Sequence, residues 1–95
     1  MFLVDMNFVN KEKITPELTA QHQAHLGKEY QADKLMFGGR KAPRLGGVIV
    51  SKHSNETELR QVFDVDPLIT SGAANYSITE FEPVMAPEKF EFLFA

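Results

Sequence analysis

The 95-residue chain contains no cysteine, and this absence excludes several classes of protein. Without thiols the chain can form no disulfide framework and no thiolate nucleophile, which fits a reducing compartment such as the cytoplasm. Basic residues are also few, since 10 Lys and Arg stand against 13 Asp and Glu and leave a net charge of -3. A nucleic-acid-binding domain normally carries a basic patch, so nucleic acid is not an expected partner.

Long hydrophobic runs, internal repeats and low-complexity segments are missing as well. The longest apolar runs have the length of a strand, and no signal peptide or membrane span is apparent, so no membrane partner is expected. The chain does have 43% hydrophobic and 24% charged residues, which is typical of a folded globular protein. Residues 1–95 therefore form one small domain, and a domain of this size leaves enough surface exposed to favour a homodimer or higher homo-oligomer.

Hydrophobic periodicity predicts an α+β domain with the element order β-α-β-β-α-β. The predicted strands cover residues 2–9, 35–37, 48–50 and 73–82, and the predicted helices cover residues 16–30 and 55–65. This order indicates a ferredoxin-like sandwich, in which a four-stranded antiparallel sheet carries two helices on one face.

Capping residues set the expected helix boundaries. Thr15, followed by Pro16, has the hydroxyl and the first-turn proline that begin a helix. Ser54 can cap the second helix, and Pro67 is expected to end it. Asp66 would then lie at the end of this second helix and continue its apolar stripe inward.

The sheet face away from the helices is predicted to be partly polar. The first and fourth strands are neighbours in this topology, so Asp5 and Asn7 would lie beside Asn75, Ser77 and Thr79. We expect Asn7 and Ser77 to help line a ligand cavity between this face and a partner sheet.

The C-terminal tail alternates apolar and other residues in the pattern of a strand. Phe90, Phe92 and Phe94 recur at every second position, and such a segment is an aggregation hazard when it is exposed. We expect residues 84–95 to be an oligomerisation extension, with a further strand docked on the chain's own sheet or on a partner's.

His22 and Asp66 are the candidate catalytic pair. His22 shares a helix face with Leu18 and Leu26, and Asp66 lies on the other predicted stripe, so both should point inward. A carboxylate that orients an imidazole gives a positioned general base. The alternative is a satisfied core histidine and an Asp that only bonds nearby amides.

Other patterns are less specific. His22, His25 and Glu29 have a spacing that some metal sites use, although such spacing is common by chance, and no metal or other cofactor is expected. His53 is expected to be a solvated turn residue. The glycine pairs around residues 38–47 predict tight turns, or close backbone approach to a ligand at Gly39 with Arg40 or Arg44 holding an anionic group.

Three motifs resemble the YciI-like (YCII-related) family, within the dimeric α/β-barrel superfamily. They are His22 with the later Gly38-Gly39, the segment Pro43–Ile49, and the segment Asp66–Gly72 with its Asp-Pro-(hydrophobic)-x-x-x-Gly pattern. The resemblance implies a ferredoxin-like fold and a site centred on that His and Asp.

The resemblance also implies kinship with small enzymes that isomerise ring-containing acids or hydroxylated aromatics, or eliminate from them. Family members often carry Arg three residues before the His, where this chain has Thr19, so Arg40 or Arg44 would hold the anion instead. We therefore expect a cofactor-independent lyase or isomerase acting on a small cyclic or anionic metabolite. The alternative is a non-catalytic module that binds a small ligand or only assembles.

Overall fold

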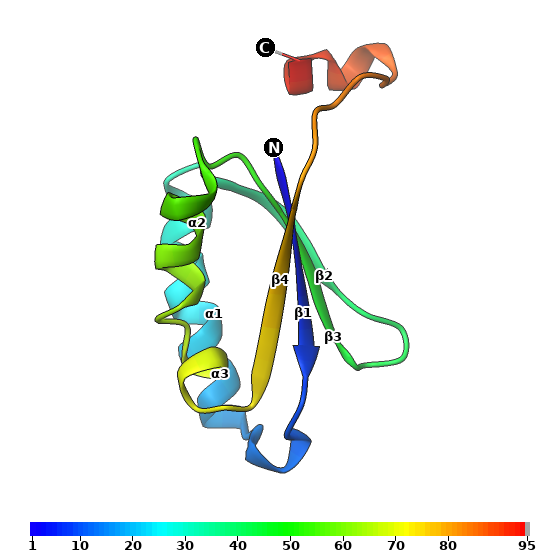
Figure 1. Ribbon diagram of the computed structural model, residues 1–95. Helices are drawn as coiled ribbons and strands as arrows, with labels where there is room; N and C mark the ends of the chain where they lie inside the picture. Colours follow the sequence, from blue (N-terminus) through cyan, green and yellow to red (C-terminus); the bar gives the residue numbers. More distant parts are fainter. Residues whose placement is uncertain (95) are drawn as a thin grey trace.

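The structure is a computed structural model that describes residues 1–94 (Figure 1). In chain order its strands and α-helices are β1 (Phe2–Phe8), α1 (Pro16–Gln31), β2 (Leu35–Arg40), β3 (Gly46–Ser51), α2 (Glu56–Phe63), α3 (Pro67–Thr70) and β4 (Ala74–Glu80). Two 3₁₀ segments, η1 (Lys11–Lys13) and η2 (Glu88–Phe94), complete the elements. Within this part of the chain no helix has both the length and the hydrophobicity needed to cross a bilayer.

The four strands form one antiparallel sheet with the order β2-β3-β1-β4. The helices all lie against one face of this sheet, as Figure 1 shows. This is the predicted α+β, ferredoxin-like arrangement, with the central strands β1 and β3 flanked by β4 and β2. The short helix α3, between α2 and β4, is an addition that the periodicity did not predict.

The helix starts follow from side-chain caps. The Thr15 hydroxyl accepts a hydrogen bond from the Leu18 amide at 3.1 Å, which confirms the predicted start of α1. The second helix is capped by Asn55, not Ser54, because the Asn55 side-chain oxygen accepts from the Glu58 amide at 2.8 Å. The sequence offered two good capping residues in a row, and the prediction chose the wrong one.

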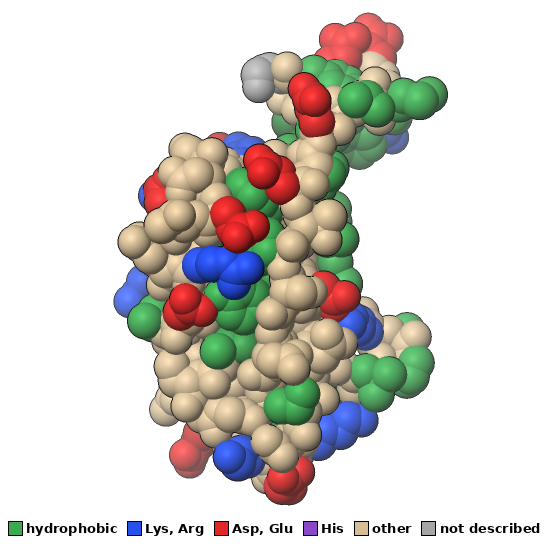
Figure 2. Space-filling model, viewed as in Figure 1, with side chains coloured by type: hydrophobic (Ala, Val, Ile, Leu, Met, Phe, Trp, Pro, Cys, Tyr) green, Lys and Arg blue, Asp and Glu red, His purple; other side chains and the backbone are tan. Residues whose placement is uncertain are grey.

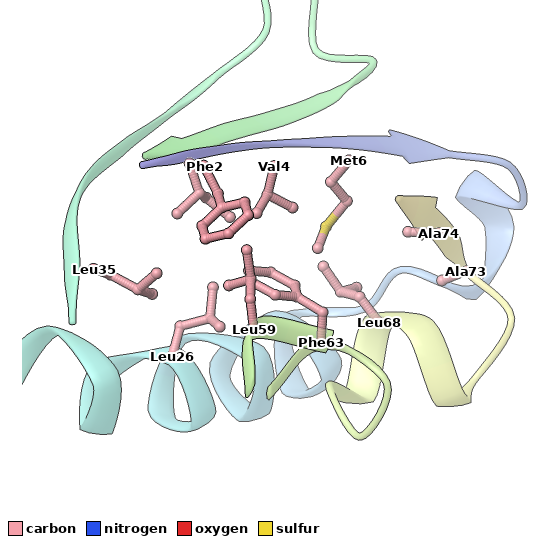
Figure 3. Packing of buried hydrophobic residues seen from close by; sticks show 11 residues of the cluster. Phe2, Val4, Met6, Leu26, Leu35, Leu59, Phe63, Leu68, Ala73 and Ala74 are labelled. Carbon is pink, nitrogen blue, oxygen red and sulfur yellow. The ribbon is translucent and has the colours of Figure 1, made fainter. Parts of the chain in front are cut away.

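The core lies between the helices and the sheet (Figure 3). From β1, alternate side chains point down onto the helices, and Leu59 and Phe63 of α2 meet them with no exposed surface. The other buried apolar residues are Phe2, Val4, Met6, Leu26, Leu35, Ile49, Leu68, Ala73 and Ala74. The period of two along β1 therefore predicted the buried face correctly.

The other sheet face carries the predicted polar residues. Asp5 lies opposite Ser77 on β4, and Asn7 lies opposite Asn75. Lys41, from the connection between β2 and β3, reaches over this face to the Asp5 carboxylate at 2.5 Å and the Asn7 side-chain oxygen at 2.6 Å. The adjacency of the first and fourth strands is thus confirmed.

The tail does not form a strand on the chain's own sheet, so this part of the expectation was wrong, whereas docking on a partner's sheet stays a prediction. Residues 88–94 form 3₁₀ turns, beginning with a hydrogen bond from the Phe90 amide to the Pro87 carbonyl at 2.9 Å. Pro83 and Pro87 lack the amide hydrogen that a sheet ladder requires, so β4 does not continue as a paired strand into the tail. Figures 1 and 2 show the tail projecting beyond the end of the sheet.

Candidate active site

A cavity of about 590 Å³ lies between α1 and the sheet. One wall comes from α1, the floor from β1, β2 and β3, and one end from α3. The lining residues are Met6, Phe8, Ile14, Thr19, His22, Gln23, Leu26, Tyr30, Gly38, Gly39, Arg40, Arg44, Gly46, Gly47, Ile49 and Leu68. This volume is in the range of small-molecule sites in proteins.

Glycines open this cavity. Gly38 pairs with Ile49, whose buried side chain faces the helices, and Gly47 pairs with Met6, which faces them too. Gly38 and Gly47 therefore stand where side chains would otherwise fill the space above the sheet. Gly46, at φ 155°, comes so close to the Met6 carbonyl that a methyl group there would overlap it.

His22 and Asp66 meet at the α3 end of the cavity. The His22 Nδ1 atom lies 2.8 Å from Asp66 Oδ2 and 3.0 Å from Oδ1. Asp66 has no exposed side-chain surface, whereas His22 is 18% exposed. Because an ionised carboxylate can only accept, Nδ1 carries the proton, and Nε2 is left with a lone pair available to the cavity.

The position of Asp66 differs from the prediction. The second helix already ends at Phe63, and Asp66 caps the next helix, α3, by accepting a hydrogen bond from the Leu68 amide at 2.9 Å. Pro67 begins α3 as its first residue instead of ending α2. The inward direction of the carboxylate comes from this cap and not from the stripe of α2.

The predicted ligand-binding residues divide between two faces of the sheet. Gly39, Arg40 and Arg44 line the same cavity as His22. Among residues 1–94 neither guanidinium forms an ion pair, so both remain available to a ligand. Asn7 and Ser77 lie on the opposite face of the sheet, away from His22, so one ligand cannot touch both sets within one chain.

Tyr30 is a cavity residue that the sequence reasoning missed. Its hydroxyl lies above Gly38, where a β-carbon would come within 2.8 Å of it. Burial raises the pKa of Tyr30 above 10.0, so the hydroxyl stays protonated and can donate to a ligand. Tyr30 follows His22 by eight residues and Leu26 by four, and this helical spacing could have identified it.

The other two histidines are held away from this cavity. The His25 Nε2–H donates to the Val62 carbonyl at 2.6 Å. The prediction that His53 is a solvated turn residue was wrong, because its side chain is buried. Its Nδ1 atom lies 2.6 Å from the Ser51 hydroxyl, and its Nε2 atom lies 3.2 Å from the Glu29 carboxylate. Residues 1–94 contain no group of three or more His, Cys, Asp or Glu side chains arranged to hold a metal ion.

Comparison with protein families gives a match over most of the chain. The family model of the YCII-related domain matches residues 3–82, which include β2, β3, β4, all of β1 except Phe2, and both members of the His22–Asp66 pair. A search of curated proteins gives no match. Since the match spans most of the chain, from the start of β1 to just after β4, the chain belongs to the YCII-related domain family.

Proposed function

We propose that the chain is a cofactor-independent acid/base enzyme, of the lyase or isomerase type, that acts on a small cyclic or anionic metabolite. The observation that carries this proposal is the contact between the fully buried Asp66 carboxylate and His22 Nδ1 at the edge of a cavity. A buried carboxylate fixes the tautomer of the imidazole and stabilises the imidazolium that forms when Nε2 takes a proton.

The cavity supports a ligand of limited size with one anionic group. Its walls are largely apolar, from residues such as Leu26, Ile49 and Leu68, which suits the faces of a ring. Arg40 and Arg44 supply positive charge, and the Tyr30 hydroxyl supplies a neutral donor. Glycine backbone on the floor allows a flat molecule to lie close to the sheet.

The proposed reaction begins with the transfer of one proton. His22 Nε2 takes a proton from a substrate carbon, and the electron pair of the broken C–H bond forms a new double bond. In an isomerisation the substrate already has a double bond next to that carbon, the π electron pair of this bond moves to its far atom, and the imidazolium returns the proton to that atom. In an elimination the electron pair displaces a leaving group, which receives the proton. A positioned acid/base of this kind contributes about 10²–10⁴-fold in rate.

A metabolite screen tests the proposal. Small carboxylic acids with rings or double bonds are incubated with the wild type, with His22→Asn, and with the matched control His25→Gln, which changes a histidine outside the cavity. We expect conversion of at least one compound by the wild type and the control, and a loss of about 10²-fold or more with His22→Asn.

The competing function is ligand binding or assembly without turnover. The apolar walls and unpaired arginines would serve a binding protein equally well. Compounds that bind wild type and His22→Asn with the same affinity, without conversion by either, would establish that function and reject catalysis.

A further inference from the structure

The C-terminal segment, residues 82–94 and called the tail from here on, exposes several apolar side chains to solvent. The last backbone hydrogen bond from this end to the sheet is that of the Phe81 amide to the Met1 carbonyl, at 2.9 Å. Beyond it, the exposed fraction is 77% for Val84, 90% for Met85 and 56% for Phe92. A cluster of exposed apolar side chains of this kind marks a surface that binds another protein surface.

The charge of the tail limits what it can bind. Glu82, Glu88 and Glu91 outnumber the single cation Lys89, so the tail is acidic as well as apolar. A partner surface must therefore be basic and must offer exposed apolar side chains.

The connection between β2 and β3 is such a surface. This hairpin, residues 37–47, contains Arg40, Lys41 and Arg44 and no acidic residue. Its apolar side chains Phe37 and Leu45 are 63% and 48% exposed. Lys41 is already paired with Asp5, so the two arginines are the charges free to meet the tail. Figure 2 shows the acidic tail and the hairpin, with its basic and hydrophobic side chains, as separate projections.

The tail and the hairpin of one chain lie at opposite ends of the sheet. The end of β4 pairs with the start of β1, at Glu80 and Phe2, whereas the hairpin pairs with the end of β1, at Asn7 and Gly46. The strand between these ends spans about 20 Å, at the usual rise per residue. Figure 1 shows the tail directed away from the hairpin of its own chain.

We propose that the tail of one copy docks on the β2–β3 hairpin of a second copy. In a two-fold pair with antiparallel sheets, each tail meets the other copy's hairpin, so both contacts form at once. The glutamates of the tail face Arg40 and Arg44, and its phenylalanines pack at Leu45. Each guanidinium carries five N–H donors, so one edge can meet a tail carboxylate while another remains directed to a ligand in the cavity.

This contact would complete the candidate active site. Arg40 and Arg44 line the cavity, which the described part of a single chain leaves open to solvent. A docked tail adds apolar side chains at that opening and excludes water, which strengthens interactions between charges inside. The contact does not depend on whether His22 moves a proton.

Single cysteines test the contact directly, because the native chain has none. Chains with Leu45→Cys and chains with Phe92→Cys are mixed under mild oxidation at about 10 µM. We expect a disulfide between them to form at least about tenfold faster than in the control, because docking raises the effective thiol concentration towards millimolar. The control pairs Leu45→Cys with Val65→Cys, a residue 60% exposed on the helix side of the sheet. Equal rates in the two mixtures would overturn the proposal.

Two further measurements separate docking on a second copy from docking within one chain. In a chain with both Leu45→Cys and Phe92→Cys, we expect a disulfide that joins two chains on a non-reducing gel. A disulfide within a single chain would place the tail on its own hairpin and refute docking on a second copy. Deletion of residues 86–95 should lower the number of chains in the assembly, as measured by sedimentation equilibrium. An unchanged number of chains would also overturn the proposal.

The charge pairing has its own test. Arg40→Glu with Arg44→Glu should weaken association about tenfold, as should Glu88→Lys with Glu91→Lys, since each places like charges together. All four changes in one chain should restore association. Failure of that restoration would reject the assigned pairing.

Discussion

Replacing Asp66 with Asn keeps the shape of the side chain but changes the atoms offered to His22. In the wild type Oδ1 accepts from the Leu68 amide, and both oxygens face His22 Nδ1. An Asn that keeps the helix cap must place its carbonyl oxygen at the Oδ1 position and its NH₂ group at the Oδ2 position. That NH₂ group faces Nδ1, so His22 must carry its proton on Nε2 instead.

The three histidines provide their own comparison. His22 is the one ring whose Nδ1 must carry the proton, since His25 donates from Nε2 to a carbonyl and His53 donates from Nε2 to Glu29. When the rings are neutral, ¹H–¹⁵N correlation spectra should show one Nδ1–H ring and two Nε2–H rings. In Asp66→Asn all three should be Nε2–H rings.

The stability cost separates the two roles of Asp66. Asp66→Asn exchanges a charge-assisted hydrogen bond for a neutral one and should cost about 1 kcal/mol. Asp66→Ala also removes the cap and leaves Nδ1 without a partner, for a total of about 2–4 kcal/mol. With a urea m value of about 1 kcal/mol/M, these losses lower the unfolding midpoint by roughly 1 M and 2–4 M. A His22 ring that stays in the Nδ1–H form in Asp66→Asn would refute the reasoning.

Three other predictions follow from packing and burial. Burial raises the pKa of Tyr30 and Tyr76 above 10.0, so the unfolded chain loses these protons first, and stability should fall as pH rises above about 10. An absorbance titration of phenolate with its midpoint at or below 10 would contradict this. Leu59→Ala should cost about 2–4 kcal/mol in urea unfolding, because Leu59 has no exposed surface; a loss under about 1 kcal/mol would show that the core readjusts. Gly38→Ala should displace the Tyr30 ring and shift its NMR signals, while Gly39→Ala, with open space around its β-carbon, should leave them unchanged.

Local signals in the sequence were sufficient for the arrangement of strands and helices. Alternation along β1 predicted its buried face, and Thr15 with Pro16 predicted the start of α1. Both features depend only on residues that are close together in the sequence. The antiparallel neighbours β1 and β4 then followed from the order of elements.

The features that sequence reasoning missed depend on contacts between distant parts of the chain. His53 is buried because Glu29, 24 residues earlier, reaches it from α1. Asp66 was expected to face inward, and it does, but as the cap of a separate short helix, whose four residues are too few for a periodic pattern. Asn7 lies across the sheet from the cavity because the cavity formed on the helix side, where two glycines made room.

Asp66 Oδ1 both caps α3, through the Leu68 amide, and lies close to His22 Nδ1. This double role affects how sequence differences within the family can be interpreted. A chain that did not use His22 would still need a cap on α3, so selection for folding alone would retain a capping residue such as Asp or Asn at position 66. His22 caps no helix and is partly exposed, so drift would remove it first. A relative that keeps a capping residue at position 66 but lacks His22 would therefore fold without the candidate catalytic pair, and that one pair of positions distinguishes the two cases.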